Sequence, residues 1–141
     1  MDWRGEYDQI IVAANRYGLF PQFIAAIRKT ENGGPGKEFG VLSVSAPTFA
    51  DQLRVCCQTV RHRLITFDVD DTTLEPYVAP NGDTVVVYSV GFMHYLAGIY
   101  CPIGADNDPN GLNRNWFNNL THWYFHLLDA EHQVVSSQTN A

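Results

Sequence analysis

The chain has 141 residues and a formal net charge of −6, and 45% of its residues are hydrophobic and 13% aromatic. This length favours one domain with a hydrophobic core, and the composition excludes a disordered chain. The acidic balance, without Lys/Arg clusters, excludes a phosphate-binding track for nucleic acid. No run of about 18 apolar residues indicates a membrane span. We expect no signal peptide, because the first six residues lack a basic segment followed by an apolar one.

The first predicted helix covers about residues 6–17, where apolar side chains recur at helical spacing, and Gly18 is expected to end it. A second, short helix is predicted over residues 21–31. Pro21 suits its first position because the amide hydrogen that proline lacks would have no partner there. Gly33, in the glycine-rich turn that follows, suits a helix stop.

The longest predicted helix covers residues 49–67. Thr48 and Asp51 have the spacing of a capping box at its start, and apolar residues follow at helical intervals. The helix also carries charged side chains that are expected to face solvent, namely Arg54, Arg61 and His62.

The three cysteines do not make a disulfide framework. Cys56 and Cys57 are adjacent within the third helix, where we expect them to pack as small hydrophobic side chains. A bridge from Cys101 to either of them stays open for an oxidising compartment. A catalytic cysteine is disfavoured, because no partner histidine can be argued from the sequence.

The segment from residue 68 to 83 is acidic, contains threonine and proline, and lacks a helical period. Asn81 and Gly82 are typical of a tight turn, and residues 84–88 have strand propensity. A small hairpin is therefore predicted in this part of the chain.

Two further helices complete the predicted fold. Ser89 is expected to cap a helix that ends at Tyr100, and the last helix is predicted over about residues 113–130, with a broad apolar stripe. Residues 134–141 form a polar tail that is expected to fray. Together the elements predict a single, mainly α domain over residues 1–133, with at most a small β-hairpin.

Glu31 is the strongest candidate for a catalytic residue. At about 100° per residue, it falls in an arc roughly 100° wide with Phe23, Ile24 and Ile27, while Ala25 falls on the opposite side. An apolar wall and the negative end of the helix dipole both disfavour the ionised carboxylate, and a raised pKa is what a general acid near neutral pH needs. The alternative is a glutamate at a frayed helix end, turned to solvent.

Two other groups of residues fit metal sites only in part. Residues 106–111 match the first half of a calcium loop, but Phe117 stands where a bidentate glutamate would be required. His122 and His126 are one helical turn apart, but the metalloprotease pattern needs a glutamate where this chain has Trp123. We therefore expect no metal and no other cofactor.

Two segments resemble known families. The run Ile24-Ala-Ala-Ile-x-x-x-Glu31, with a glycine-containing turn and then Phe39-Gly-Val-Leu-Ser43, resembles the lysozyme-like superfamily of soluble lytic transglycosylases and goose-type lysozymes. The later segment Phe92–Trp116 resembles transglycosylase-like domains of bacteriophage and prophage wall-degrading proteins. The resemblance covers roughly residues 20–60 and 89–120. It implies an α-rich, two-lobed fold whose cleft binds peptidoglycan glycan strands, with Glu31 as the catalytic residue.

The resemblance also indicates substrate contacts. Ser43 stands where the family often has glutamine. The family signature Ala-Tyr-Asn-Ala-Gly is missing, and Tyr100 or the loop that contains Asn107 would occupy the equivalent side of the groove. Tyr124 is a further candidate to hydrogen-bond the sugars.

The predicted reaction is cleavage of the β-1,4 bond between N-acetylmuramic acid and N-acetylglucosamine, with Glu31 protonating the glycosidic oxygen. An inverting hydrolase needs a second carboxylate about 6.5–9.5 Å away. No strong candidate stands out: Asp68, Asp70, Asp71 and Glu75 cluster in the acidic loop, where such a run is usually solvated but could supply one. A lytic transglycosylase can instead reuse Glu31 as a base, so the sequence slightly favours transglycosylation over hydrolysis.

We expect a monomer that is made in the cytoplasm and acts on the bacterial cell wall, either with a phage or after export by another route. Two alternatives stay open. The chain could be a non-catalytic glycan-binding or phage structural module with a lysozyme-like fold. It could also be an unrelated helical interaction domain that uses the loop at residues 106–113 for recognition.

Overall fold

The computed structural model describes residues 3–42, 45–67, 72–100 and 113–133. In these residues the elements are, in chain order, α1 (Trp3–Tyr17), α2 (Pro21–Glu31), α3 (Phe49–Thr66), β1 (Leu74–Val78), β2 (Thr84–Tyr88), α4 (Val90–Tyr100) and α5 (Arg114–Glu131). The prediction of a mainly helical chain with one small hairpin is confirmed. The expected tail, residues 134–141, lies outside the described residues.

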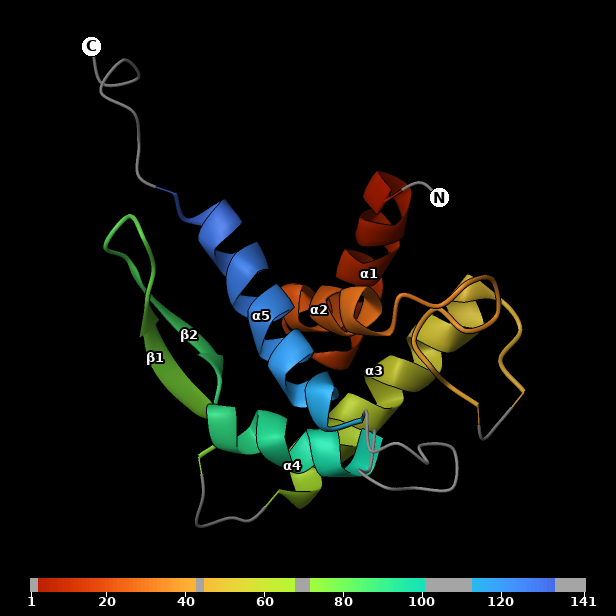
Figure 1. The fold of residues 1–141 in the computed structure, drawn as a ribbon. Helices are drawn as coiled ribbons and strands as arrows, with labels where there is room; N and C mark the ends of the chain where they lie inside the picture. Colours follow the sequence, from red (N-terminus) through yellow and green to blue (C-terminus); the bar gives the residue numbers. More distant parts are fainter. Residues whose placement is uncertain (1–2, 43–44, 68–71, 101–112, 134–141) are drawn as a thin grey trace.

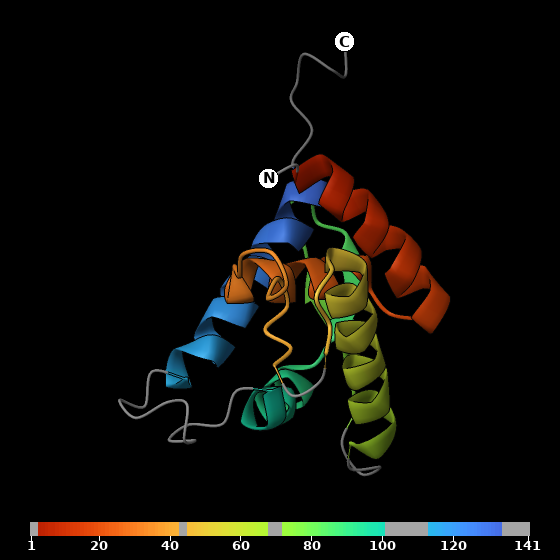
Figure 2. The ribbon, with the colours of Figure 1, turned by 90° about the vertical axis from the view of Figure 1, so that its right-hand side faces the viewer.

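Helix α2 forms the centre of the fold. It lies in the middle of Figure 1, with α1 above it, α5 and α3 on its two sides and α4 below. All side chains from Phe23 to Arg28 are buried, including Ala25 on the side opposite the expected apolar stripe. A surface helix would bury one stripe only, so the expectation of a one-sided helix is corrected: α2 is enclosed by its neighbours. Its most extensive contacts are with α5, which crosses it in both views (Figures 1 and 2).

The helix ends follow local signals in most cases. The Thr48 hydroxyl accepts a hydrogen bond from the Asp51 amide at 3.1 Å at the start of α3. At the start of α4, the Ser89 hydroxyl accepts one from the Phe92 amide at 3.0 Å. Both predicted caps are therefore confirmed. At the end of α2 the left-handed cap is Asn32, with φ of 47°, and not the predicted Gly33. Asparagine is, after glycine, the residue that adopts this conformation most readily.

The hairpin packs against α5. Strands β1 and β2 pair antiparallel, with Pro76 opposite Val86, and the connection between them contains the predicted turn residues. The Tyr77 ring lies 4.8 Å from the ring of Phe125, centre to centre, and its hydroxyl donates to the Asp129 carboxylate. These contacts fix the hairpin along α5, as Figure 1 shows.

One continuous core joins the helices and β2. Its centre is aromatic: the rings of Phe23, Tyr88, Phe92 and Tyr124 pack together in edge-to-face, tilted and stacked arrangements. Cys56 and Cys57 are buried in the same core as free thiols, as expected for small hydrophobic side chains. In the part of the chain that the structure describes, no helix is long and apolar enough to cross a membrane.

Candidate active site

Glu31 is the last residue of α2, and its carboxyl group is held by a residue far away in the sequence. The indole N–H of Trp116, in the first turn of α5, donates a hydrogen bond of 2.7 Å to Oε1 of Glu31. Burial raises the pKa of Glu31 above its ordinary value of 4.5, and the hydrogen bond from Trp116 acts in the opposite direction. The direction of this shift is the one predicted from the apolar surroundings of the helix.

Trp116 is fixed in place by Tyr100. Their rings stack with centres 5.1 Å apart and planes 20° apart, and only 5% of Trp116 is exposed. The Tyr100 hydroxyl donates to the carbonyl oxygen of Phe39 and also interacts with the Cys56 thiol. The end of α4 thus supports the start of α5, and through it the carboxyl group of Glu31.

Gly40 lies directly against this carboxyl group. A β-carbon placed on Gly40 would stand 2.4 Å from Oε2 and 2.5 Å from Cδ of Glu31, and its φ is +70°. Both the space and the backbone conformation therefore require glycine. Gly40 belongs to the segment that resembles the lysozyme-like superfamily, so this part of the segment and Glu31 meet in space.

The loop that carries Gly40 is clamped from inside by Gln52 of α3, which is fully buried. Its Oε1 accepts from the amides of Phe39 and Val41, both at 3.1 Å. Its Nε2 lies within hydrogen-bond distance of the carbonyl oxygens of Gly36, Val41 and Ala46, at 2.8, 3.0 and 2.9 Å. A single side chain therefore replaces the backbone pairing that this irregular segment lacks.

A buried ion pair holds the other end of the same loop. The Arg28 guanidinium contacts the Glu6 carboxylate at 3.1 Å and donates to the carbonyl oxygens of Gly33 and Glu38. Glu38 in turn accepts from the Gly36 amide at 2.9 Å. Helices α1, α2 and α3 thus all contribute to the position of the loop that faces Glu31.

Replacing Gly40 with Ala should reduce the catalytic activity that the sequence predicts for Glu31 far more than it reduces stability. The added methyl group would overlap the carboxyl group, which can turn away only by losing its bond to Trp116. The left-handed backbone adds about 1–2 kcal/mol of strain. Gly18→Ala is the matched control, because Gly18 has φ of +69° but nothing within 4 Å of the added methyl group. Equal effects of both changes on cell-wall lysis, measured beside urea unfolding, would contradict the contact between Gly40 and Glu31.

The raised pKa of Glu31 makes stability depend on pH in a defined direction. The Glu31 carboxyl group binds its proton more tightly in the folded protein than in the unfolded chain. Its contribution to the free energy of unfolding is therefore largest below pH 4.5, and it falls as the pH rises through the pKa of Glu31 in the folded protein. Glu31→Gln removes the titration. The variant should match the native protein in urea unfolding below pH 4.5 and exceed it near neutral pH. A difference that is the same at both pH values would show that burial does not shift this group.

The other residues predicted to contact the substrate lie in different environments in the structure. Tyr124 is fully buried, and its hydroxyl accepts from the Tyr88 amide at 3.2 Å, so the expectation that it contacts sugars is corrected: it is a core residue. Tyr100 does lie at the Glu31 site, but its hydroxyl is taken by Phe39, which makes it a support rather than a sugar contact. Ser43 and Asn107 lie outside the described residues.

Trp116 was missed as a site residue from the sequence, where it counted only as part of the apolar stripe of the last helix. The available signal was its place at the end of the second resembling segment. A tryptophan at this position is equally compatible with core packing. Trp116 and Glu31 are 85 positions apart, so no local sequence pattern indicates that they meet.

Most of the predicted acidic candidates for a second carboxylate lie outside the described residues, namely Asp68, Asp70 and Asp71. Glu75 is described, and its Oε1 accepts from the Val90 amide at 3.0 Å where β1 meets the start of α4. Two further glutamates have structural partners: Glu6 is paired with Arg28, and Glu38 accepts a hydrogen bond from the Gly36 amide.

The partial metal motifs gain no further ligands in the described part of the chain. The imidazole rings of His122 and His126 stack with centres 6.0 Å apart. Among the described residues, no three His, Cys, Asp or Glu side chains come together in a group that could hold a metal ion. The calcium-like segment 106–111 and Cys101 lie outside the described residues.

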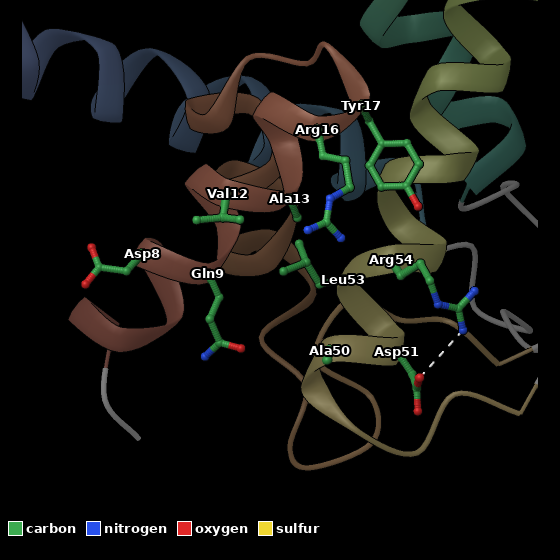
Figure 3. Close-up of a pocket in the computed structure, with 10 residues that line it drawn as sticks. All are labelled: Asp8, Gln9, Val12, Ala13, Arg16, Tyr17, Ala50, Asp51, Leu53 and Arg54. Atoms are coloured by element: carbon green, nitrogen blue, oxygen red, sulfur yellow. Dashed lines mark ion pairs between the residues drawn. The ribbon is translucent and has the colours of Figure 1, made fainter.

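A pocket of about 540 Å³ lies between α1 and α3, as Figure 3 shows. Val12 and Leu53 contribute apolar surface to it, and Arg54 turns toward Asp51 at 3.6 Å. The hydrogen bond to Thr48 holds the pKa of Asp51 below its ordinary value, which reflects helix capping. Glu31 is not among the described residues that line this pocket. The pocket and the candidate catalytic residue therefore lie in different parts of the structure.

Comparison of the chain with protein-family models, with curated proteins and with solved structures finds no match. The case for a function therefore depends on the geometry around Glu31 and on the resemblance of the two sequence segments.

Proposed function

We propose that this protein cleaves the β-1,4 bond between N-acetylmuramic acid and N-acetylglucosamine in peptidoglycan, with Glu31 as the general acid. The observation that carries the proposal is the state of the Glu31 carboxyl group. It is buried enough to raise its pKa, it ends a rigid central helix, and it is held by Trp116 against Gly40. A carboxylic acid that keeps its proton closer to neutral pH is what protonation of a glycosidic oxygen requires.

The polar partner that the described residues give to the carboxyl group, Trp116, supports this role. Trp116 donates to Glu31 but has no basic group that could keep it ionised, in contrast to Glu6, which is paired with a buried arginine. A structural glutamate at a helix end would gain stability from such a cation. In the described part of the chain, Glu31 instead loses solvent and no cation contributes to its pKa, an arrangement typical of acids that must stay protonated.

The substrate class follows from the resemblance to lysozyme-like and transglycosylase-like domains. Both resembling segments contribute to the same place, because the first supplies Glu31 and Gly40 and the second supplies Tyr100 and Trp116. Glycan strands of the bacterial wall are therefore the proposed partner, and the wall is the proposed site of action.

Lytic transglycosylation is the favoured form of the reaction. Glu31 would first protonate the glycosidic oxygen as positive charge develops on the sugar ring, and the ionised carboxylate would then accept a proton from the sugar's own hydroxyl, closing an anhydro ring. One carboxyl group suffices for both steps. Of the described carboxylates, Glu6 and Glu38 are occupied with structural partners, which fits a mechanism that needs no second carboxylate.

Incubation of the purified protein with purified peptidoglycan, followed by mass analysis of the soluble fragments, tests the proposal. Transglycosylation should yield disaccharide fragments lighter by one water than the hydrolytic products. Fragments of the hydrolytic mass would move the assignment to a lysozyme with a second carboxylate. Binding to the wall without any soluble fragments would contradict the enzyme and favour a non-catalytic glycan-binding module.

A further inference from the structure

We propose that Trp116 is a positioning residue that fixes which oxygen of Glu31 carries the acidic proton: Oε1 is anchored by the indole, and Oε2, beside Gly40, is the proton-donating oxygen. The proposal rests on the proposed function for what receives the proton. If Oε2 donates the proton, the glycosidic oxygen of the substrate must bind on the Oε2 side of the carboxyl group.

The two oxygens of Glu31 have different surroundings. Oε1 accepts the indole hydrogen of Trp116 at 2.7 Å, and an indole can donate but not accept. The oxygen that bears the hydrogen in a carboxylic acid is the poorer acceptor, so this bond favours the proton on the other oxygen. Oε2 is the atom nearest to the position that a β-carbon on Gly40 would occupy. Because Gly40 has no side chain, the carboxyl group can pack against its backbone with Oε2 on that side, away from the indole.

The indole cannot easily follow the carboxyl group if that group rotates. Trp116 is nearly buried, its ring is stacked on Tyr100, and its amide donates to the Asn113 carbonyl oxygen at 2.9 Å. Tyr100 is tied in turn to the carbonyl oxygen of Phe39, the residue before Gly40. The donor to Oε1 and the glycine beside Oε2 thus belong to one connected unit, which sets the orientation of the carboxyl plane.

Among the described residues, two other titratable groups interact with Glu31 from the packed elements. Burial raises the pKa of the Tyr100 hydroxyl, on α4, and of the Cys56 thiol, on α3, well above their ordinary values. Both groups are therefore neutral through the range in which Glu31 titrates. The indole hydrogen bond is then the polar interaction that changes in strength when Glu31 loses its proton.

The test removes the indole N–H and keeps the ring. Trp116→Phe shortens the side chain, and substitution of Trp116 by benzothienylalanine, in which sulfur replaces the N–H group, keeps its shape. Titration of the Glu31 carboxyl carbon by NMR should show a pKa above that of the native protein in both variants, because a donor to the ionised form is lost. Trp123→Phe is the matched control: it lies on the same helix, where its ring faces Lys29, and it should leave the titration of Glu31 unchanged.

An unchanged or lowered pKa of Glu31 in the benzothienylalanine variant, with a native melting temperature, would overturn the proposal. In the activity assay, the alkaline limb of wall cleavage should move to higher pH in the same variant, and kcat should fall while KM stays near its native value. If Trp116 had only a structural role, the variant would contain less folded protein, but the alkaline side of its pH profile would stay at the native pH. If the native protein does not cleave walls but the titration shifts as expected, the proposed function fails and the anchoring of Oε1 stands.

Discussion

Glu31→Gln should reduce cleavage of purified peptidoglycan by about 10²–10⁴-fold, the usual contribution of a positioned acid. The amide keeps the size of the side chain and can still accept the indole hydrogen through its oxygen, so the bond to Trp116 and the packing against Gly40 should persist. It has no carboxylic proton to give. Fragment release from purified walls, measured beside thermal melting of both proteins, checks this expectation.

Glu75→Gln provides the matched control for this experiment. Its Oε1 also accepts a hydrogen bond, from the Val90 amide, and the amide can preserve that bond. The control should keep full activity if Glu31 alone supplies the acid. A Glu31→Gln protein that melts normally and still releases fragments at more than about a third of the native rate would remove Glu31 from the mechanism.

Gln52→Leu should destabilise the protein by at least about 3 kcal/mol, because buried polar groups without a partner cost about 1–3 kcal/mol each. The change would remove the partner of the amides of Phe39 and Val41 and of three carbonyl oxygens in the same loop. Gln52→Glu should also destabilise, since a carboxylate cannot donate to those carbonyl oxygens. Urea unfolding of the native protein and both variants gives the free energies.

Gln58→Leu is the control for Gln52→Leu, with the same substitution in the same helix. Gln58 is exposed, and its one described hydrogen bond, to the Tyr17 hydroxyl, is 3.4 Å long. We expect a change within about 0.5 kcal/mol, as for most surface substitutions. Amide hydrogen exchange should separate the two variants further, since only Gln52→Leu should expose the amides of Phe39 and Val41. Similar losses in both variants would mean that the loop does not depend on the buried amide.

The two experiments test different parts of one arrangement. In the proposed mechanism Glu31 supplies the acid, and the loop held by Gln52 and Arg28 supplies the surface against which its carboxyl group is placed. Loosening that loop should therefore lower wall cleavage even in molecules that remain folded. Activity per folded molecule, determined for Gln52→Leu at a temperature below its melting point, measures this coupling.

The sequence by itself determined the features that depend on neighbouring residues. The bounds of α2, the caps at Thr48 and Ser89 and the hairpin turn all follow from contacts within a few positions along the chain. The direction of the Glu31 pKa shift was likewise predictable, because Phe23, Ile24 and Ile27 place Glu31 on an apolar side of the same short helix.

Only the tertiary structure decided which distant residues meet Glu31. Trp116 is 85 positions away, and Tyr100 and Gly40 reach the same place from two other segments. The helical period of α5 could not separate Trp116, which serves the site, from Tyr124, which is buried in the core, since both lie on its apolar face. Periodicity shows that a side chain turns inward, and only the packing of the other helices decides whether it meets a carboxyl group or the hydrophobic core.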